Sequence, residues 1–148
     1  MPTHEYRVNV AWSGGKDGSG QVEAPESGES FALAVPHEFG GPGGATNPEE
    51  LLTSAIASCY SITLGIIAQN RKLPIQEMKV AAVGEVDQQG ATFTYKRVTI
   101  RPTITLSGEA TDEQRNQARD MAMKADHYCI ITNAVRDKVE VTVEPTLQ

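Results

Sequence analysis

Residues 46–72, TNPEELLTSAIASCYSITLGIIAQNRK, carry the signals of one long apolar helix. Asn47 is a suitable N-cap, Pro48 fits the first helical position, and Glu50 supplies the acid of a capping box. Apolar side chains then recur at helical spacing: Leu52, Ile56, Cys59, Ile62, Ile66 and Ile67. The stretch therefore predicts a helix of about six turns with a cysteine near its middle.

Upstream of this helix, the sequence predicts an antiparallel meander. Alternating apolar and polar residues at 6–12 are typical of a half-buried strand, and the turn-forming segment SGGKDGSG follows it. Two more strands are expected near residues 20–24 and 30–35. Glycine and proline dominate the next segment, PHEFGGPGGATNPEE, which predicts an ordered, irregular loop that leads into the helix.

Downstream of the helix, alternating residues at 78–86 and 98–106 predict two long strands joined by a turn. Pro102 within the second strand indicates an edge or a bulge, because proline cannot donate to a ladder. A capping box at Thr111 opens a helix that runs to about residue 125. A short helical segment and a final strand, KVEVTVE, complete the chain, so the element order favours an α+β fold with antiparallel sheets and a long central helix.

Composition limits the possible functions. A chain of 148 residues fits one domain, residues 1–148, and a formal charge of −6 with 5% aromatic residues argues against a nucleic-acid partner. The N-terminus resembles no signal peptide, and no run approaches the roughly 20 apolar residues of a membrane span, so a cytoplasmic protein is expected. The long helix is apolar over so much of its surface that a partner subunit is expected to cover part of it.

The two cysteines lie 70 positions apart, too few and too distant for a secreted disulfide framework. Cys59 is in the middle of its helix, where the helix dipole gives little help in forming a thiolate. Glu49 precedes it by ten residues, about 15 Å along one straight helix. If Glu49 acts together with Cys59, either another chain supplies this acid or the helix begins later. Cys129 is expected near the N-terminus of a short helix, where a proton is more easily lost or where it can meet another sulfur.

Other interpretations of these residues are possible. Free cysteine is among the most buried residue types, so packing alone can explain Cys59. A zinc site made by Cys59, Cys129, His37 and His127 lacks the usual ligand spacing, and no metal or cofactor is expected. The glycine-rich loop lacks the ending of a phosphate-binding loop and carries two acids where phosphate would lie.

The motifs TNPEELLTSAIASCYS and ADHYCIITNAV together resemble the OsmC/Ohr family of osmotically inducible and organic hydroperoxide resistance proteins, over nearly the whole chain. The resemblance implies an intertwined homodimer in which Cys59 is the peroxidatic thiol, Cys129 the resolving thiol and Glu49 the acid of the Asn-Pro-Glu motif. It also implies an organic hydroperoxide substrate and an external dithiol or lipoylated reductant. Lipophilic surroundings from Leu52, Ile56 and Ile62 would favour organic hydroperoxides.

The chain departs from the family pattern in the turn after the first strand. Relatives of the Ohr type carry an arginine there, whereas this chain has Lys16. Lysine offers a compact ammonium charge in place of the planar guanidinium of arginine, which can form two parallel hydrogen bonds. Arg7 or His37 could supply the missing cation. Ile130 follows the second cysteine where many relatives have proline, and the long glycine-rich loop favours the OsmC-like branch. The alternative function is a non-catalytic protein of this fold that binds or senses a small lipophilic ligand.

Overall fold

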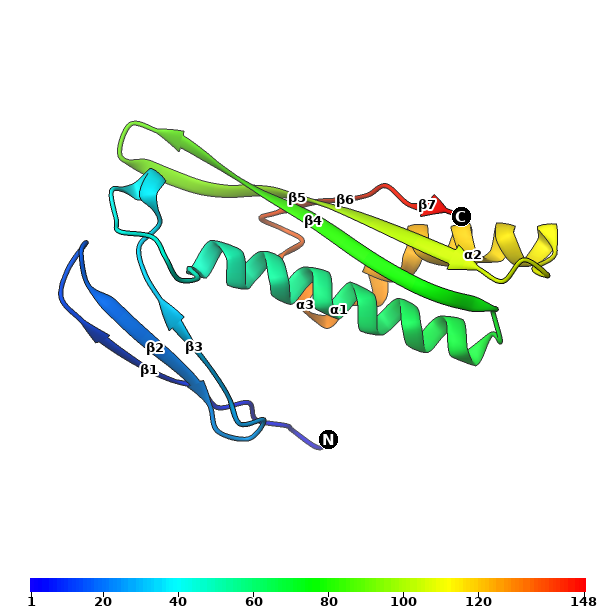
Figure 1. The fold of residues 1–148 in the computed structure, drawn as a ribbon, viewed down its shortest axis with the longest axis horizontal. Helices are drawn as coiled ribbons and strands as arrows, with labels where there is room; N and C mark the ends of the chain where they lie inside the picture. The colour runs from blue at the N-terminus through cyan, green and yellow to red at the C-terminus, as the bar shows by residue number, and fades with distance from the viewer. The chain divides into compact units, whose positions relative to one another are not determined.

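The computed structural model describes residues 1–148 and consists of two compact units, Met1–Leu51 and Leu52–Gln148. The first unit contains an antiparallel sheet with the strand order β1-β2-β3 (Figure 1). Its elements are β1 (Asn9–Ser13), β2 (Ser19–Ala24), β3 (Glu29–Leu33) and the 3-10 helix η1 (His37–Phe39). The expected meander and the irregular loop after it are therefore confirmed.

The predicted half-burial of the first strand is wrong within the unit Met1–Leu51. β1 begins at Asn9, and all five of its residues are exposed. Val10 and Trp12, which the alternating pattern places on an apolar face, are 59% and 44% exposed. The alternation is present, but no layer within the unit Met1–Leu51 buries this face.

The long helix α1 spans Pro48–Asn70 and begins where the sequence predicts. The backbone N–H of Glu50 donates to Asn47 Oδ1 at 2.9 Å, which is the expected N-cap bond. The Glu50 carboxylate accepts from the Thr46 hydroxyl at 2.9 Å. Residues at a spacing of four form the buried stripe of the helix: Ile56, Tyr60, Leu64 and Ala68.

By length and composition, α1 could cross a membrane, with a mean hydropathy of 1.8 over its most apolar window. Our expectation that no apolar run approaches this length is therefore wrong for α1. Core helices of soluble proteins pass the same test, so the observation is weak evidence for a membrane protein.

A long hairpin dominates the second unit (Figure 1). Its strands, β4 (Ile75–Gln89) and β5 (Thr92–Leu106), pair antiparallel, and Gly90 takes a positive φ of 63° at the turn. The remaining elements are α2 (Asp112–Lys124), η2 (Ala125–Tyr128), α3 (Ile130–Val135), β6 (Glu140–Val143) and β7 (Thr146–Leu147). Thr111 caps α2 with the predicted capping box, in which Gln114 is the partner residue.

Two expectations about this sheet need correction. β6 and β7 both pair parallel to β5, so the sheet is mixed and not wholly antiparallel. The helical connection between β5 and β6 explains this, because a parallel neighbour requires a long crossover. β5 is also central and not an edge strand, and the register shifts lie away from Pro102. Pro102 lies between the part of β5 that pairs with β6 and the part that pairs with β7. No parallel strand is paired with this residue, so the sheet tolerates a residue without a backbone N–H.

One core fills the second unit, on a single face of the sheet. The buried stripe of α1 packs there with even-numbered residues of β5 and with Ala118 and Ala122 of α2. The opposite face carries ion pairs, such as Arg97 with Glu85 and Arg101 with Glu144, each at 3.5 Å. This one-sided core places the middle of α1 against the turn between α2 and α3.

Candidate functional site

The structure brings the two cysteines together. Cys59 lies in the middle of α1 and is partly buried, whereas Cys129 lies between η2 and α3 and is 0% exposed. Both are free thiols. The Cys59 side chain is near enough to Cys129 to raise its pKa through both charge and a hydrogen bond. Two sulfurs that are 70 positions apart in sequence are therefore neighbours in the folded chain.

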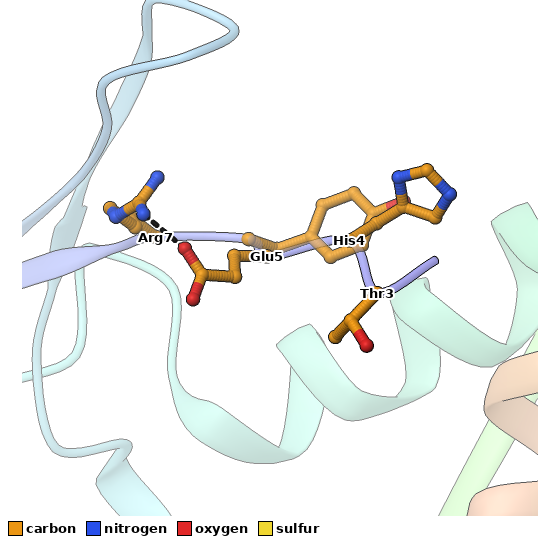
Figure 2. A pocket seen from close by; sticks show the side chains of 5 residues that line it. Thr3, His4, Glu5 and Arg7 are labelled. Carbon is orange, nitrogen blue, oxygen red and sulfur yellow. Dashed lines mark hydrogen bonds and ion pairs between the residues drawn. The ribbon is translucent and has the colours of Figure 1, made fainter. Parts of the chain in front are cut away.

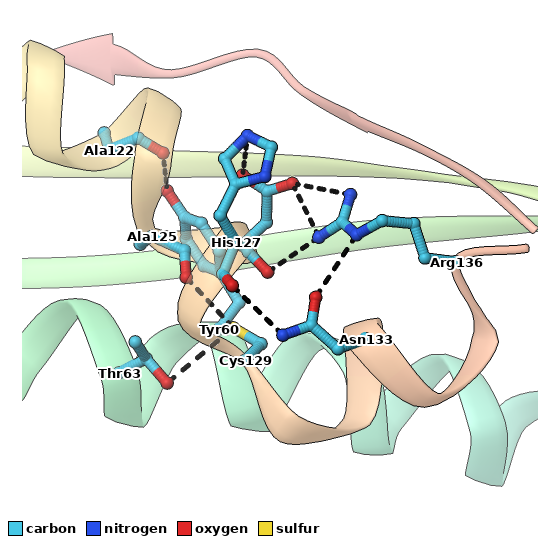
Figure 3. A network of polar contacts seen from close by, with 9 residues as sticks. Tyr60, Thr63, Ala122, Ala125, His127, Cys129, Asn133 and Arg136 are labelled. Atoms are coloured by element: carbon cyan, nitrogen blue, oxygen red, sulfur yellow. Dashed lines mark hydrogen bonds and ion pairs between the residues drawn. The ribbon is translucent and has the colours of Figure 1, made fainter.

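Oxygen atoms from two elements surround the Cys129 sulfur (Figure 3). Cys129 Sγ lies 3.3 Å from the Ala125 carbonyl oxygen and 3.7 Å from Thr63 Oγ1 of α1. Thr132, three residues further along, is 0% exposed. Burial raises the pKa of Cys129 to about 11, with the Cys59 thiol adding to the rise, while the Thr63 and Thr132 hydroxyls lower it.

This pKa corrects the expectation that Cys129 loses its proton easily. Cys129 is the N-cap residue of α3, as expected, but its side chain makes no capping hydrogen bond. Since α3 has only six residues and the thiol is buried, desolvation of the thiolate outweighs the helix dipole.

Tyr60 adds a buried phenol beside the cysteines. Its side chain is 0% exposed, and its hydroxyl donates to the Ala122 carbonyl oxygen at 2.6 Å (Figure 3). Burial raises the Tyr60 pKa, and the charges of Asp126 and Cys129 raise it further. The phenol therefore stays neutral and ties α1 to the end of α2.

A polar network holds the turn that carries Cys129 (Figure 3). Asp126 is buried, and its backbone oxygen accepts from Arg136 Nη2 at 2.9 Å. The same guanidinium lies 3.4 Å from Asp126 Oδ2, and its Nε donates to Asn133 Oδ1 at 3.2 Å. Asn133 Nδ2 donates in turn to the His127 carbonyl oxygen at 3.0 Å. Arg136, at the end of α3, is thus connected to η2 directly through Asp126 and indirectly through Asn133 and His127.

Sequence reasoning missed most of these residues. It treated His127 only as a rejected zinc ligand, and it did not single out Tyr60, Thr63 or Thr132. Part of the signal was available, because Thr63 lies four residues after Cys59 and so shares its helical face. The approach of Thr132 depends on how α3 meets α1, which no local pattern reveals.

The acid and the three candidate cations lie in the unit Met1–Leu51, whereas both cysteines lie in the unit Leu52–Gln148. Glu49 is the second residue of α1 and lines a small apolar pocket of about 310 Å³ with Trp12 and Phe39. Since α1 begins at Pro48, the possibility that the helix begins later is wrong. Glu49 and Cys59 of one chain are therefore separated by about 15 Å of helix.

The candidate cations differ in their surroundings. Lys16 lies against Gly40 in the glycine-rich loop, and His37 Nδ1 donates to the Gly41 carbonyl oxygen at 3.2 Å. The structure thus brings Lys16 and His37 to the same loop. Arg7 instead forms an ion pair with Glu5 in the exposed N-terminal segment (Figure 2). It forms a second ion pair with Glu26, which follows β2. No three His, Cys, Asp or Glu side chains are grouped so as to hold a metal ion.

Comparisons with known proteins agree with this architecture. A family model described as OsmC-like protein matches residues 41–144. The chain is 30% identical to the uncharacterized protein YmaD of Bacillus subtilis, over 100% of this chain and 97% of that protein. It is 26% identical to the organic hydroperoxide resistance protein-like 2 of Staphylococcus epidermidis, over 100% of both chains.

The fold has counterparts among solved structures. The crystal structure of an organic hydroperoxide resistance protein OsmC from Legionella pneumophila matches with a TM-score of 0.76 and 26% identity. That match covers 97% of this chain and 99% of the Legionella chain. The α+β architecture described above is therefore that of the OsmC fold.

Proposed function

This chain belongs to the OsmC-like protein family, and we propose that it acts as a thiol-dependent peroxidase that reduces organic hydroperoxides. The observation that carries the proposal is the pairing of a partly exposed cysteine with a buried one in a shared core. A buried thiol next to an accessible thiol is the arrangement that a two-cysteine peroxidase requires. The relatives named for organic hydroperoxide resistance support the substrate class.

In the proposed cycle, Cys59 is the nucleophile because an external peroxide can reach it. Its thiolate attacks the distal peroxide oxygen, the O–O bond breaks, and the alcohol leaves after taking a proton. Cys59 is then a sulfenic acid. Cys129 attacks this sulfur, water leaves, and a disulfide joins the two residues. An external dithiol, for example a lipoylated protein, reduces that disulfide before the next turnover.

The surroundings of the thiols favour an organic substrate, although not through all the residues that we expected. Ile56 is 0% exposed and belongs to the core, whereas Ile62 is 64% exposed. A groove of about 570 Å³ instead begins at Thr63, beside Cys129, and is mainly apolar. Its lining residues are Thr63, Ile66, Ile67, Asn70, Arg71, Met121, Lys124 and Tyr128.

We propose that the complete site is formed by an intertwined homodimer in the cytoplasm. Because Glu49 and Cys59 are too far apart along α1 to meet within one chain, the partner's α1 would supply the acid. Lys16 or His37 would supply the cation that stabilises the Cys59 thiolate. The exposed apolar residues of β1 and α1, Val10, Trp12, Ile62 and Ile66, support a partner that covers them.

The test is a peroxidase assay on reduced protein with cumene hydroperoxide and a dithiol. We expect Cys59→Ser to abolish peroxide loss, because no nucleophile remains. Cys129→Ser should still form a sulfenic acid at Cys59, detectable by a sulfenic-acid probe and mass spectrometry, but should form no intramolecular disulfide. Ser58→Ala, next to Cys59 on an exposed position, is the matched control and should retain activity. Equal, slow peroxide loss in all variants would sink the proposal.

The same groove favours one alternative from another class, a non-catalytic protein that binds a small lipophilic ligand. In that case a lipophilic fluorescent probe should bind the wild type and Cys59→Ser equally well, and Ile67→Glu should abolish binding. Peroxide turnover that depends on Cys59 would decide against this alternative.

A further inference from the structure

The burial of the two sulfurs determines which of them an external reductant can reach. Cys129 is 0% exposed, whereas Cys59 is only partly buried. A dithiol from solution therefore attacks Cys59 in the proposed disulfide, and Cys129 is the sulfur that leaves. The rate of such an exchange depends on how well the leaving sulfur carries negative charge.

The charged and titratable groups around Cys129 give its thiolate little help. Cys59 and Tyr60 lie beside it on α1, and Asp126 of η2 lies near Tyr60. Arg136 approaches within 3.4 Å of Asp126 Oδ2 and is engaged with that residue. None of these contacts places a positive charge on the sulfur.

Two threonine hydroxyls remain as possible donors. Thr63 Oγ1 lies 3.7 Å from Cys129 Sγ, while the thiol can use its single proton toward the Ala125 carbonyl oxygen at 3.3 Å. Thr132 Oγ1 is buried and has no hydrogen-bond partner in this thiol form. Thr132 follows Cys129 by three residues, a spacing that brings side chains together at a helix start. A buried hydroxyl without a partner is costly unless another state of the protein uses it.

We propose that Thr63 and Thr132 form a two-hydroxyl site for the Cys129 thiolate, which is released when the Cys59–Cys129 disulfide is reduced. This inference rests on the proposed peroxidase cycle. One thiolate of the dithiol attacks Cys59 Sγ and forms a mixed disulfide, while the Cys59–Cys129 bond breaks and its electron pair stays on Cys129. Both hydroxyls then donate to that sulfur until it takes a proton.

The second thiol of the reductant completes the exchange. It attacks the reductant sulfur of the mixed disulfide, and Cys59 leaves as a thiolate. The reductant becomes an intramolecular disulfide, and the protein gains two electrons and two protons. In this cycle the two hydroxyls act on Cys129, so they should affect the steps in which Cys129 is a thiolate. Thr132 is not among the residues that line the groove, so its loss should leave peroxide attack at Cys59 unchanged.

The first test measures the Cys129 thiol directly, in a Cys59→Ser background that needs no peroxide. Alkylation rate against pH gives the fraction of thiolate. Thr63→Val and Thr132→Val keep the side-chain shape and remove the hydroxyl. Each should lower the thiolate fraction at a fixed alkaline pH about tenfold, equivalent to about one pKa unit. Thr63→Ser and Thr132→Ser should restore it, and Thr99→Val, a buried threonine on β5, is the matched control.

The second test follows reduction of the disulfide in the otherwise intact chain, after oxidation with a chemical oxidant. We expect each valine variant to slow reduction by dihydrolipoamide by roughly threefold to tenfold. The rate of sulfenic acid formation at Cys59 should not change in Thr132→Val, and this comparison uses Thr132→Val alone because Thr63 also lines the proposed substrate groove. Circular dichroism would confirm folding, and the two variants lie on different helices, so one suffices if the other fails to fold.

These measurements separate the inference from the proposed function. Valine variants with an unchanged thiolate fraction and reduction rate would overturn the role of the threonines, even if the chain is an active peroxidase. Lowered thiolate fraction and slower reduction would support that role even if peroxide turnover proved slow.

Discussion

Tyr60 joins three functions in one side chain: core packing, a hydrogen bond between helices and a neutral neighbour for the thiols. Its hydroxyl is buried and donates to Ala122 O at 2.6 Å. We expect Tyr60→Phe to lower the free energy of unfolding by about 1–3 kcal/mol, because the Ala122 carbonyl loses its phenol donor. Urea denaturation measures this change. Tyr6→Phe, at an 88% exposed tyrosine, should change stability little, and equal effects of the two substitutions would contradict the argument.

The raised pKa of Cys129 has a consequence for stability at alkaline pH. Its pKa rises from 9.0 to about 11 on folding, so the folded state holds this proton more tightly than the unfolded state. The contribution of this proton to the free energy of unfolding is complete below pH 9.0. It is lost as the pH rises to about 11, at roughly 1.4 kcal/mol per pH unit. Tyr60 acts in the same direction at higher pH, since burial also raises its pKa.

Denaturation of reduced protein across this pH range is the measurement. The wild type should lose stability steeply above pH 9.0, and Cys129→Ala should lose it less steeply. Parallel pH profiles for the two proteins would show that Cys129 is not the group responsible.

At the scale of elements, η2 is the segment on which the position of Cys129 depends. Arg136 of the turn after α3 binds both the backbone and the carboxylate of Asp126. We expect Arg136→Met to cost about 3 kcal/mol, because it leaves the buried Asp126 carboxylate without its cation. Thermal and urea unfolding measure this loss.

The double variant Asp126→Asn with Arg136→Met distinguishes this cause from lost packing. It should recover part of the stability, since no buried charge remains. Arg97→Met, which removes an exposed ion-paired arginine on the other face of the sheet, should cost less than about 1 kcal/mol. A double variant no more stable than Arg136→Met would contradict the ion-pair explanation.

The strands show how far local patterns determine elements. The N-caps at Asn47 and Thr111 predicted the first residues of α1 and α2 correctly, because a cap depends on residues within one turn. Pro102 was misjudged as an edge or bulge residue, because its tolerance depends on a gap between β6 and β7. The parallel direction of those strands also follows from the path of the connecting helices, which periodicity does not encode.

For the whole molecule, the exposed apolar surface predicts self-association. Ile62 and Ile66 of α1 are 64% and 53% exposed, although they lie on the most apolar helix. We expect the wild type to sediment as a dimer and Ile66→Glu to weaken the dimer at least tenfold, because a charge would be buried at the interface. Val83→Glu, at a similarly exposed position on the hairpin, is the control. A monomeric wild type would contradict the homodimer and the composite site.

The sequence by itself determined where the helices and strands lie, because caps, turns and periodicity act over a few residues. Through family resemblance it also indicated which two cysteines and which acid to examine. Only the tertiary structure decided that Cys59 and Cys129 are neighbours, that burial raises the Cys129 pKa, and that Thr63, Thr132 and Tyr60 surround the sulfurs. These properties depend on contacts between α1 and the turn before α3, which come from packing of segments far apart in the chain.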